Sequence, residues 1–221
     1  MRSSSRARRP SSRESMGSPR RIEAFVREVE RAVDVAVDGQ SRPVLAFSGG
    51  LASLLLAMVA RKRSDLRCLV AGVEGSADLA AAKRAKDSFE YRVEAVPLDA
   101  AGVRTIAAGL AMDFPGLTVA QRSDLVPVRA VLLRASETSV LAGLRGGRHS
   151  VEVGRAAESA GVRLPLLHVM GGGISRDTVR SAALYLGLPA AWARVRHRSP
   201  SEGAGIAHLL RPHDCGRLRR R

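Results

Sequence analysis

The sequence predicts an α/β protein with a parallel β-sheet, helices on both faces of the sheet and a mostly helical C-terminal part. Three observations support this prediction. Strand-like runs alternate with helical patterns through the first half of the chain, the strand-like runs are almost wholly apolar, and the pattern from His149 onward is mainly helical. Continuous apolar strands indicate a sheet that is buried on both faces, because a strand with one wet face alternates apolar and polar residues.

The first predicted elements are an amphipathic helix, a short buried strand and a second helix. Apolar residues recur at helical spacing over residues 22–37. The strand covers residues 42–47, and apolar residues on one face of a helix follow over residues 51–59. A loop at residues 48–50, with the sequence Ser-Gly-Gly, joins this strand to the second helix. In a parallel sheet the loop lies at the carboxyl end of the strand, where open α/β sheets bind ligands.

The same alternation continues as far as residue 144. We expect further strands at residues 66–73, 91–98 and 138–144. Helices are expected after Ser76 or Asp78, both of which suit an N-cap, and at residues 100–112 and 123–137.

The clearest helix of the C-terminal part begins at Ser175, which suits an N-cap, and ends at Gly187, with Pro189 beyond it. Trp192 follows on a helical stretch and is interpreted as a core residue, since few aromatic residues are present to form a base-stacking surface.

Composition divides the 221 residues into a core and two basic ends. We expect a disordered basic arm at residues 1–20, an α/β core at 21–148, a helical part at 149–210 and a basic tail at 211–221. The net charge is +15, and ends of this kind neutralise phosphates without reading sequence. Nucleic acid is therefore a candidate partner, with codon bias as the alternative explanation for the arginines. Met16 is an alternative start that would remove most of the arm.

Several classes of protein are disfavoured. No apolar run reaches the roughly 18 to 20 residues of a membrane span, and the N-terminus has no apolar segment of a secretory signal. Cys68 and Cys215 form neither a CxxC motif nor a disulfide framework, so a reducing, cytoplasmic setting is expected. Zinc binding is disfavoured because the spacing of its candidate ligands matches no closed site; these ligands are His208, His213, Asp214 and Cys215.

The Ser-Gly-Gly loop predicts an anion-binding site. Its backbone N–H groups and those of the next helix's first turn would converge on one point, where the helix dipole favours negative charge. Glycines let phosphate oxygens approach the backbone, and the hydroxyls of Ser48 and Ser53 add donors. The alternative is a tight turn without a ligand. A second glycine run, at residues 171–173, is interpreted as a connection rather than another anion loop.

Beyond this physical argument, the run LAFSGGLASLLLA resembles the S-G-G-x-D-S signature of the PP-loop ATP pyrophosphatases. Its surroundings resemble the synthetase domain of asparagine synthetases, above all the short archaeal forms that lack a glutaminase domain. Residues 71–99 are similar to the segment after that family's second strand, and residues 175–206 to its closing segment. The three blocks occur in the family's order and together span roughly residues 43–210.

The resemblance implies an adenine nucleotide alpha hydrolase-like fold that binds ATP. In asparagine synthetases, ATP converts the side-chain carboxylate of aspartate into an acyl-adenylate, and ammonia then forms the amide. By this resemblance the pyrophosphate lies on Ser48, Gly49, Gly50 and Ser53, and the adenosine on the backbone around Ala46, Phe47 and Val73.

Departures from the family pattern bear on the chemistry. Ala52 stands where the signature has Asp, whose carboxylate in the family helps to hold magnesium. The family's later Asp-Glu pair corresponds here to SVLAGLRGGRHS, which has no acidic residue. Magnesium needs oxygen ligands, so it is expected only if other acids serve, for which the candidates are Glu74, Asp78 and Asp99.

Basic residues stand near these gaps. Arg145 and Arg148 lie beside the second gap, and His197 and Arg198 replace the lysines that the family carries near its end. The three arginines are candidate phosphate contacts, although a cation cannot ligate a metal.

Three interpretations remain open at this point. The favoured one is a diverged PP-loop protein that binds ATP or AMP and has weakened or lost ligase chemistry. The second is an active AMP-forming amide ligase that uses other acids. The third is a non-catalytic basic module on a PP-loop fold that binds nucleic acid or another partner. The sequence assigns no catalytic residue, acceptor substrate or oligomeric state.

Overall fold

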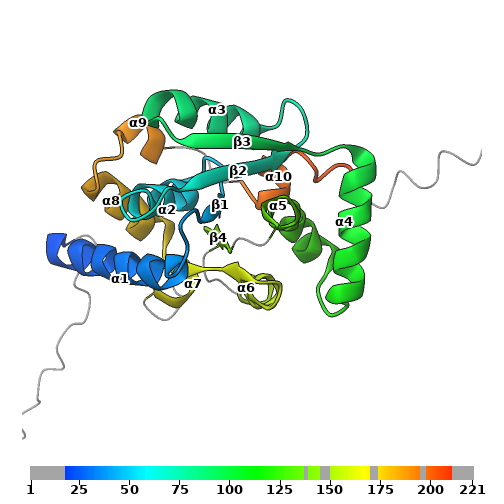
Figure 1. The fold of residues 1–221 in the computed structure, drawn as a ribbon, viewed down its shortest axis with the longest axis horizontal. Helices are drawn as coiled ribbons and strands as arrows, with labels where there is room; N and C mark the ends of the chain where they lie inside the picture. The colour runs from blue at the N-terminus through cyan, green and yellow to red at the C-terminus, as the bar shows by residue number, and fades with distance from the viewer. Residues whose placement is uncertain (1–17, 137–138, 145–149, 170–173, 195–197, 211–221) are drawn as a thin grey trace, which may run out of the picture.

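The computed structural model describes residues 18–136, 139–144, 150–169, 174–194 and 198–210. Within these ranges one sheet has the strand order β3-β2-β1-β4-β5, and every pair of neighbours is parallel. The strands are β1 Val44–Ala46, β2 Arg67–Gly72, β3 Arg92–Pro97, β4 Val140–Ala142 and β5 Val162–Arg163. Figure 1 shows helices on both sides of this sheet. The predicted α/β class with a parallel sheet is confirmed.

One face of the sheet is covered by helices from both ends of the chain. They are α1 Pro19–Val37, α2 Leu51–Ala60, α3 Ala77–Phe89, α7 Pro165–His168, α8 Arg176–Tyr185 and α9 Ala190–Ala193. Helix α2 packs against α1, α8 and β1, which is why Leu54, Leu55 and Leu56 are all fully buried. Trp192 is partly buried and packs against the core, with its ring centroid 5.0 Å from that of Phe89.

The other face carries α4 Ala100–Asp113, α5 Val119–Ala135 and α6 Ser150–Ser159. Helix α5 contacts β1, β2, β3 and β4 and also packs against α4, α6 and the short helix α10 Pro200–Gly203. Figure 1 shows α5 at the centre of this side, with α4 outside it. Over the ranges that the structure describes, no helix is both long and apolar enough to cross a bilayer.

Two elements differ from the prediction. Helix α5 begins at Val119 rather than Ser123, because Thr118 forms a capping box with Gln121: the Gln121 N–H donates to Thr118 Oγ1 at 3.2 Å, and the Thr118 N–H donates to Gln121 Oε1 at 2.8 Å. Strand β5 lies in the part predicted to be mostly helical and pairs with β4. It has two residues, too few for a periodic pattern to reveal.

The strand order places the end of β1 at a branch point of the fold. Strand β1 lies between β2 and β4, so the chain winds one way from β1 to β3 and the other way from β4 to β5. The loops that leave β1 and β4 therefore separate at the carboxyl edge of the sheet, which is where open α/β sheets bind ligands.

Candidate functional site

The loop after β1 has the strand, loop and helix order that the sequence predicts. Gly50 is the N-cap of α2 and has no side chain to cap it, so the amides of the first helical turn have no partner within the helix. The Ser53 hydroxyl donates to the Gly50 carbonyl at 2.8 Å, and the Gly50 N–H donates to Ser48 Oγ at 3.2 Å. These bonds hold the two serine hydroxyls 3.3 Å apart, on the same side of the loop.

Gly49 is required at its position for two reasons. Its φ of +67° lies in the left-handed region, which side chains disfavour. A Cβ on Gly49 would also lie 2.5 Å from Ala81 Cβ on α3, closer than van der Waals contact allows. The loop therefore lies directly against α3 and brings that helix to the carboxyl edge of β1.

Gly143, just after β4, allows a second close approach. A Cβ there would lie 3.0 Å from the Ser53 amide nitrogen and 3.1 Å from Ala52 Cβ. The residue that follows β4 is thus in contact with the first turn of α2.

A cavity of about 380 Å³ opens at this meeting point. It falls in the size range of ligand pockets, about 300 to 1,000 Å³. Its walls come from both branches of the sheet, from α2, α3, α5 and α8, and from the segment before α10. The lining residues include Ala46, Phe47, Ser48, Gly49, Gly50, Leu51, Ala52, Ser53, Leu69, Ala71, Asp78, Arg84, Asp124, Val128, Val131, Gly143, Arg176 and Arg198.

Positive charge predominates in the described lining. Arg84 comes from α3, Arg176 from the first turn of α8, and Arg198 from the segment before α10. Two carboxylates, those of Asp78 and Asp124, also line the cavity. Together with the amides of the first turn of α2, which no side chain caps, three guanidinium groups make the cavity suited to an anionic ligand.

Asp124 attaches the C-terminal segment to α5. Its Oδ1 accepts the Ser201 hydroxyl at 2.7 Å and the Ser201 N–H at 3.1 Å. The Val73 N–H donates to the Ala204 carbonyl at 3.0 Å, so the same segment is also bonded to the turn after β2. Residues 198–206, which we call the C-terminal strap, therefore connect α5 to the β2 side of the cavity and carry Arg198 to its wall.

Asp78 lies in the first turn of α3, close to the strap. Its carboxyl oxygens occupy the space that a Cβ on Gly203 would need. Burial raises the pKa of Asp78 to about 7, and the nearby positive charge of Arg198 limits this rise. Near neutral pH this carboxyl group is therefore partly protonated.

The raised pKa of Asp78 predicts a pH dependence of stability. The folded state keeps a proton on Asp78 that the unfolded state releases near pH 3.8, until the pH rises past about 7. Bound protons are thus more numerous in the folded state over this window, so the free energy of unfolding falls as the pH rises through it. In Asp78→Asn the free energy of unfolding should lose this part of its dependence on pH. Urea unfolding at several pH values between about 3.8 and 7 measures the difference. A variant with the wild-type slope would contradict the assignment.

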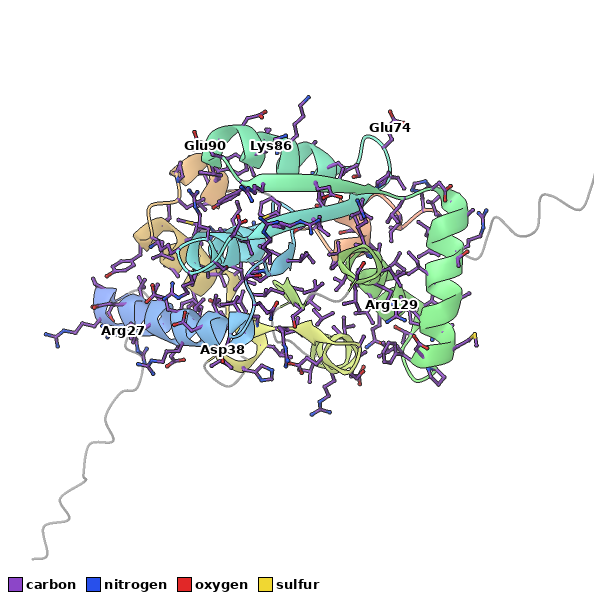
Figure 2. All side chains as sticks on the ribbon, viewed as in Figure 1. Arg27, Asp38, Glu74, Lys86, Glu90 and Arg129 are labelled. Carbon is purple, nitrogen blue, oxygen red and sulfur yellow. The ribbon has the colours of Figure 1, made fainter. Side chains whose placement is uncertain are left out.

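The structure brings together most, but not all, of the predicted site residues. Ala46, Phe47, the three loop residues, Ser53, Asp78 and Arg198 line one cavity. The backbone N–H of Val73, a predicted adenosine contact, is bonded to the strap, and Val73 is not among the lining residues. Asp99 caps α4 by accepting the Gly102 N–H at 2.6 Å. Glu74 is exposed and projects outward from the turn after β2 (Figure 2).

Other predictions fall on residues 1–17, 145–149, 170–173, 195–197 and 211–221, outside the described residues. They concern Arg145, Arg148, His197, most of the basic arm, the basic tail, the glycine run at 171–173 and three of the four candidate zinc ligands. The sequence does not identify three charged residues of the lining: Arg84, Arg176 and Asp124. The local signal for Asp124 is that it is the one acidic residue of α5.

The residues present do not fit a magnesium ion of the kind that the resemblance implies. Magnesium takes oxygen ligands, usually one or two carboxylates together with phosphates and waters. Ala52 supplies no oxygen, Asp124 Oδ1 already accepts two hydrogen bonds from Ser201, and the carboxyl group of Asp78 packs against Gly203. Among the residues that the structure describes, no group of three or more His, Cys, Asp or Glu side chains could hold a metal ion.

Comparison of the whole chain with known proteins identifies the fold. No family model and no curated protein sequence matches the chain. Solved structures do match: the NH3-dependent NAD synthetase of Campylobacter jejuni has a TM-score of 0.51 and 14% identity, over 78% of this chain and 76% of that one. The fold is the PP-loop fold.

Two further solved structures of this fold are similar to the chain. The NMN synthetase of Francisella tularensis has a TM-score of 0.54 and 13% identity, over 81% of this chain and 76% of that one. The NAD+ synthetase of Burkholderia pseudomallei has a TM-score of 0.52 and 21% identity, over 90% of this chain and 85% of that one. None of the three is an asparagine synthetase. At these identities the likeness establishes the PP-loop fold alone.

Proposed function

We propose that this chain binds ATP or AMP in the cavity after β1, with the phosphates on the Ser48–Gly50 loop and the first turn of α2. One observation carries the proposal: at the branch point of a PP-loop fold, a glycine loop, a helix N-terminus and three guanidinium groups line the same cavity. A tight turn without a ligand would not need cationic side chains from three separate segments beside it.

The rest of the cavity suits a nucleoside. Ala71, Val128 and Val131 form an apolar wall from β2 and α5, on which an adenine ring can pack. Ala46 and Phe47, directly before the loop, also line the cavity, and we assign their backbone to the adenosine. The roles of these residues follow the family resemblance of the sequence.

We also propose that the ancestral chemistry was AMP-forming amidation of a carboxylate, as in asparagine synthetases, and that it is weakened or lost here. Adenylation requires the charge on the triphosphate to be stabilised as pyrophosphate leaves. Ala52 supplies none of the metal ligation that the signature's Asp provides in the family. The chain is thus proposed to keep nucleotide binding while lacking efficient ligase activity.

Isothermal titration calorimetry with ATP and with AMP tests the binding. The wild-type chain is expected to bind at least one of them, and Gly50→Glu to abolish binding by placing a carboxylate at the phosphate position. Gly109→Glu is the matched control: Gly109 is exposed on α4, a Cβ there meets nothing within 4 Å, and the charge change is the same. Negligible heats for the wild-type chain, or equal binding by Gly50→Glu, would refute the proposed function.

The chemistry is tested by ATP–pyrophosphate exchange in the presence of aspartate and of other carboxylic acids. We expect no exchange above background from the wild-type chain. Exchange that depends on one acid would instead establish an active AMP-forming ligase and identify its acceptor.

A further inference from the structure

The described wall of the cavity combines three guanidinium groups with two carboxylates, and neither carboxylate is well suited to a metal. Asp124 is committed to the strap through two hydrogen bonds from Ser201, at 2.7 and 3.1 Å. The carboxyl group of Asp78 lies against Gly203, in the space that a Cβ on this glycine would need. The three arginines, by contrast, reach the cavity from α3, α8 and the strap.

We propose that the nucleotide binds as a metal-free anion, with Arg84, Arg176 and Arg198 compensating the phosphate charge that magnesium usually compensates. This inference rests on the proposed nucleotide binding and goes beyond it, because it specifies the ionic form of the ligand. A magnesium–nucleotide complex carries two fewer negative charges than the free nucleotide, so a site lined by guanidinium groups favours the free form.

The position of Ala52 explains why a metal is not needed. Ala52 lines the cavity in the first turn of α2, and its Cβ would lie 3.1 Å from a Cβ added to Gly143. A carboxylate at this position would point toward the bound phosphates and repel them unless a cation lay between the two. With a methyl group there, nothing in the first turn opposes a metal-free phosphate.

Partial protonation of Asp78 also favours the binding of a metal-free phosphate. Burial raises the pKa of this carboxyl group to about 7, so near neutral pH part of its negative charge is removed from the cavity. The groups facing it are Arg198 and the strap backbone at Gly203.

Calorimetry of ATP binding in EDTA and in excess magnesium chloride tests the inference. The wild-type chain is expected to bind ATP in EDTA at least as tightly as it does in excess magnesium chloride. Ala52→Asp is expected to bind about tenfold or more weakly in EDTA, corresponding to the cost of one uncompensated charge, and to recover with magnesium. Ala52→Asn, of the same size but neutral, is the matched control and should bind alike in both buffers. Thermal unfolding checks that each variant is folded.

The outcomes separate the two proposals. Wild-type binding that requires magnesium would overturn the metal-free inference and leave the proposed function standing. An Ala52→Asp variant that binds equally in both buffers would also overturn it, since position 52 would then not face the phosphates. Absence of binding in both buffers would refute the proposed function itself.

A second pair of variants tests the part assigned to the arginines. Arg84→Gln is expected to weaken ATP binding in EDTA by about tenfold or more, because it removes one charge-assisted contact. Lys83→Gln is its matched control: Lys83 is the adjacent residue on α3, it is exposed, and it does not line the cavity. Equal affinities for the two variants would show that total charge, not the Arg84 guanidinium, governs binding, and would overturn its assignment.

Discussion

Gly49→Ala should lower the free energy of unfolding by about 2 to 5 kcal/mol, the sum of a left-handed backbone penalty and overpacking. The added methyl group would lie 2.5 Å from Ala81 Cβ, so α3 must move or the loop must change its conformation. Either movement displaces the Ser48 and Gly50 positions that face the cavity. We therefore expect nucleotide binding to be lost together with the stability, as measured by urea unfolding and calorimetry.

Gly39→Ala separates the two causes. Gly39 has a similar φ, +71°, but a Cβ there meets nothing within 4 Å. Only the backbone penalty of about 1 to 2 kcal/mol is expected, with nucleotide binding unchanged. Equal destabilisation of the two variants would show that the contact between the loop and α3 is not tight.

Asp124→Ala should release the strap. The substitution removes two hydrogen bonds to a carboxylate, leaves the Ser201 amide without this acceptor and leaves the buried Ser201 hydroxyl with Ser199 Oγ at 3.2 Å, for an expected loss of about 2 to 4 kcal/mol in stability. Because the strap carries Arg198, nucleotide affinity should fall as well. Urea unfolding and calorimetry in EDTA measure the two effects.

Ser201→Ala supplies the comparison. It removes the hydroxyl bond at 2.7 Å and keeps the amide bond at 3.1 Å, so a smaller loss of about 1 kcal/mol is expected. A double-mutant cycle over the two positions gives their coupling energy. Coupling near zero would mean that Asp124 does not hold the strap.

Most of the fold could be predicted from the sequence because its patterns are local. The apolar run of β2 and the spacing of apolar residues in α1 each identify an element without reference to the rest of the chain. The start of α5 was misplaced because it depends on side-chain capping by Thr118 and Gln121, ahead of the apolar positions. Strand β5 could not be predicted because two residues are too few to show an alternating pattern. Its formation depends on pairing with β4, which is distant in the sequence.

The site was predictable only where a motif lies in one stretch of sequence. Ser48, Gly49 and Gly50 are consecutive, and their conformation follows from the strand before them and the helix after them. Arg84 and Arg176 lie on separate helices and share a cavity only because α3 and α8 pack on the same face of the sheet. Asp124 acquires its role from Ser201, 77 residues away along the chain.

The strap also determines when the cavity can form during biosynthesis. The sheet and the glycine loop are encoded before residue 164, whereas Arg198 and Ser201 follow the last helix of the α8 face. A nascent chain can therefore assemble the hydrophobic cluster around α1, α2 and α8, together with the loop, while the cavity still lacks one wall. Completing that wall requires closure of a long loop back to α5 and β2, which is a late and slow step for contacts so distant in sequence. Ligand capture during translation should therefore wait until residue 206 has emerged from the ribosome.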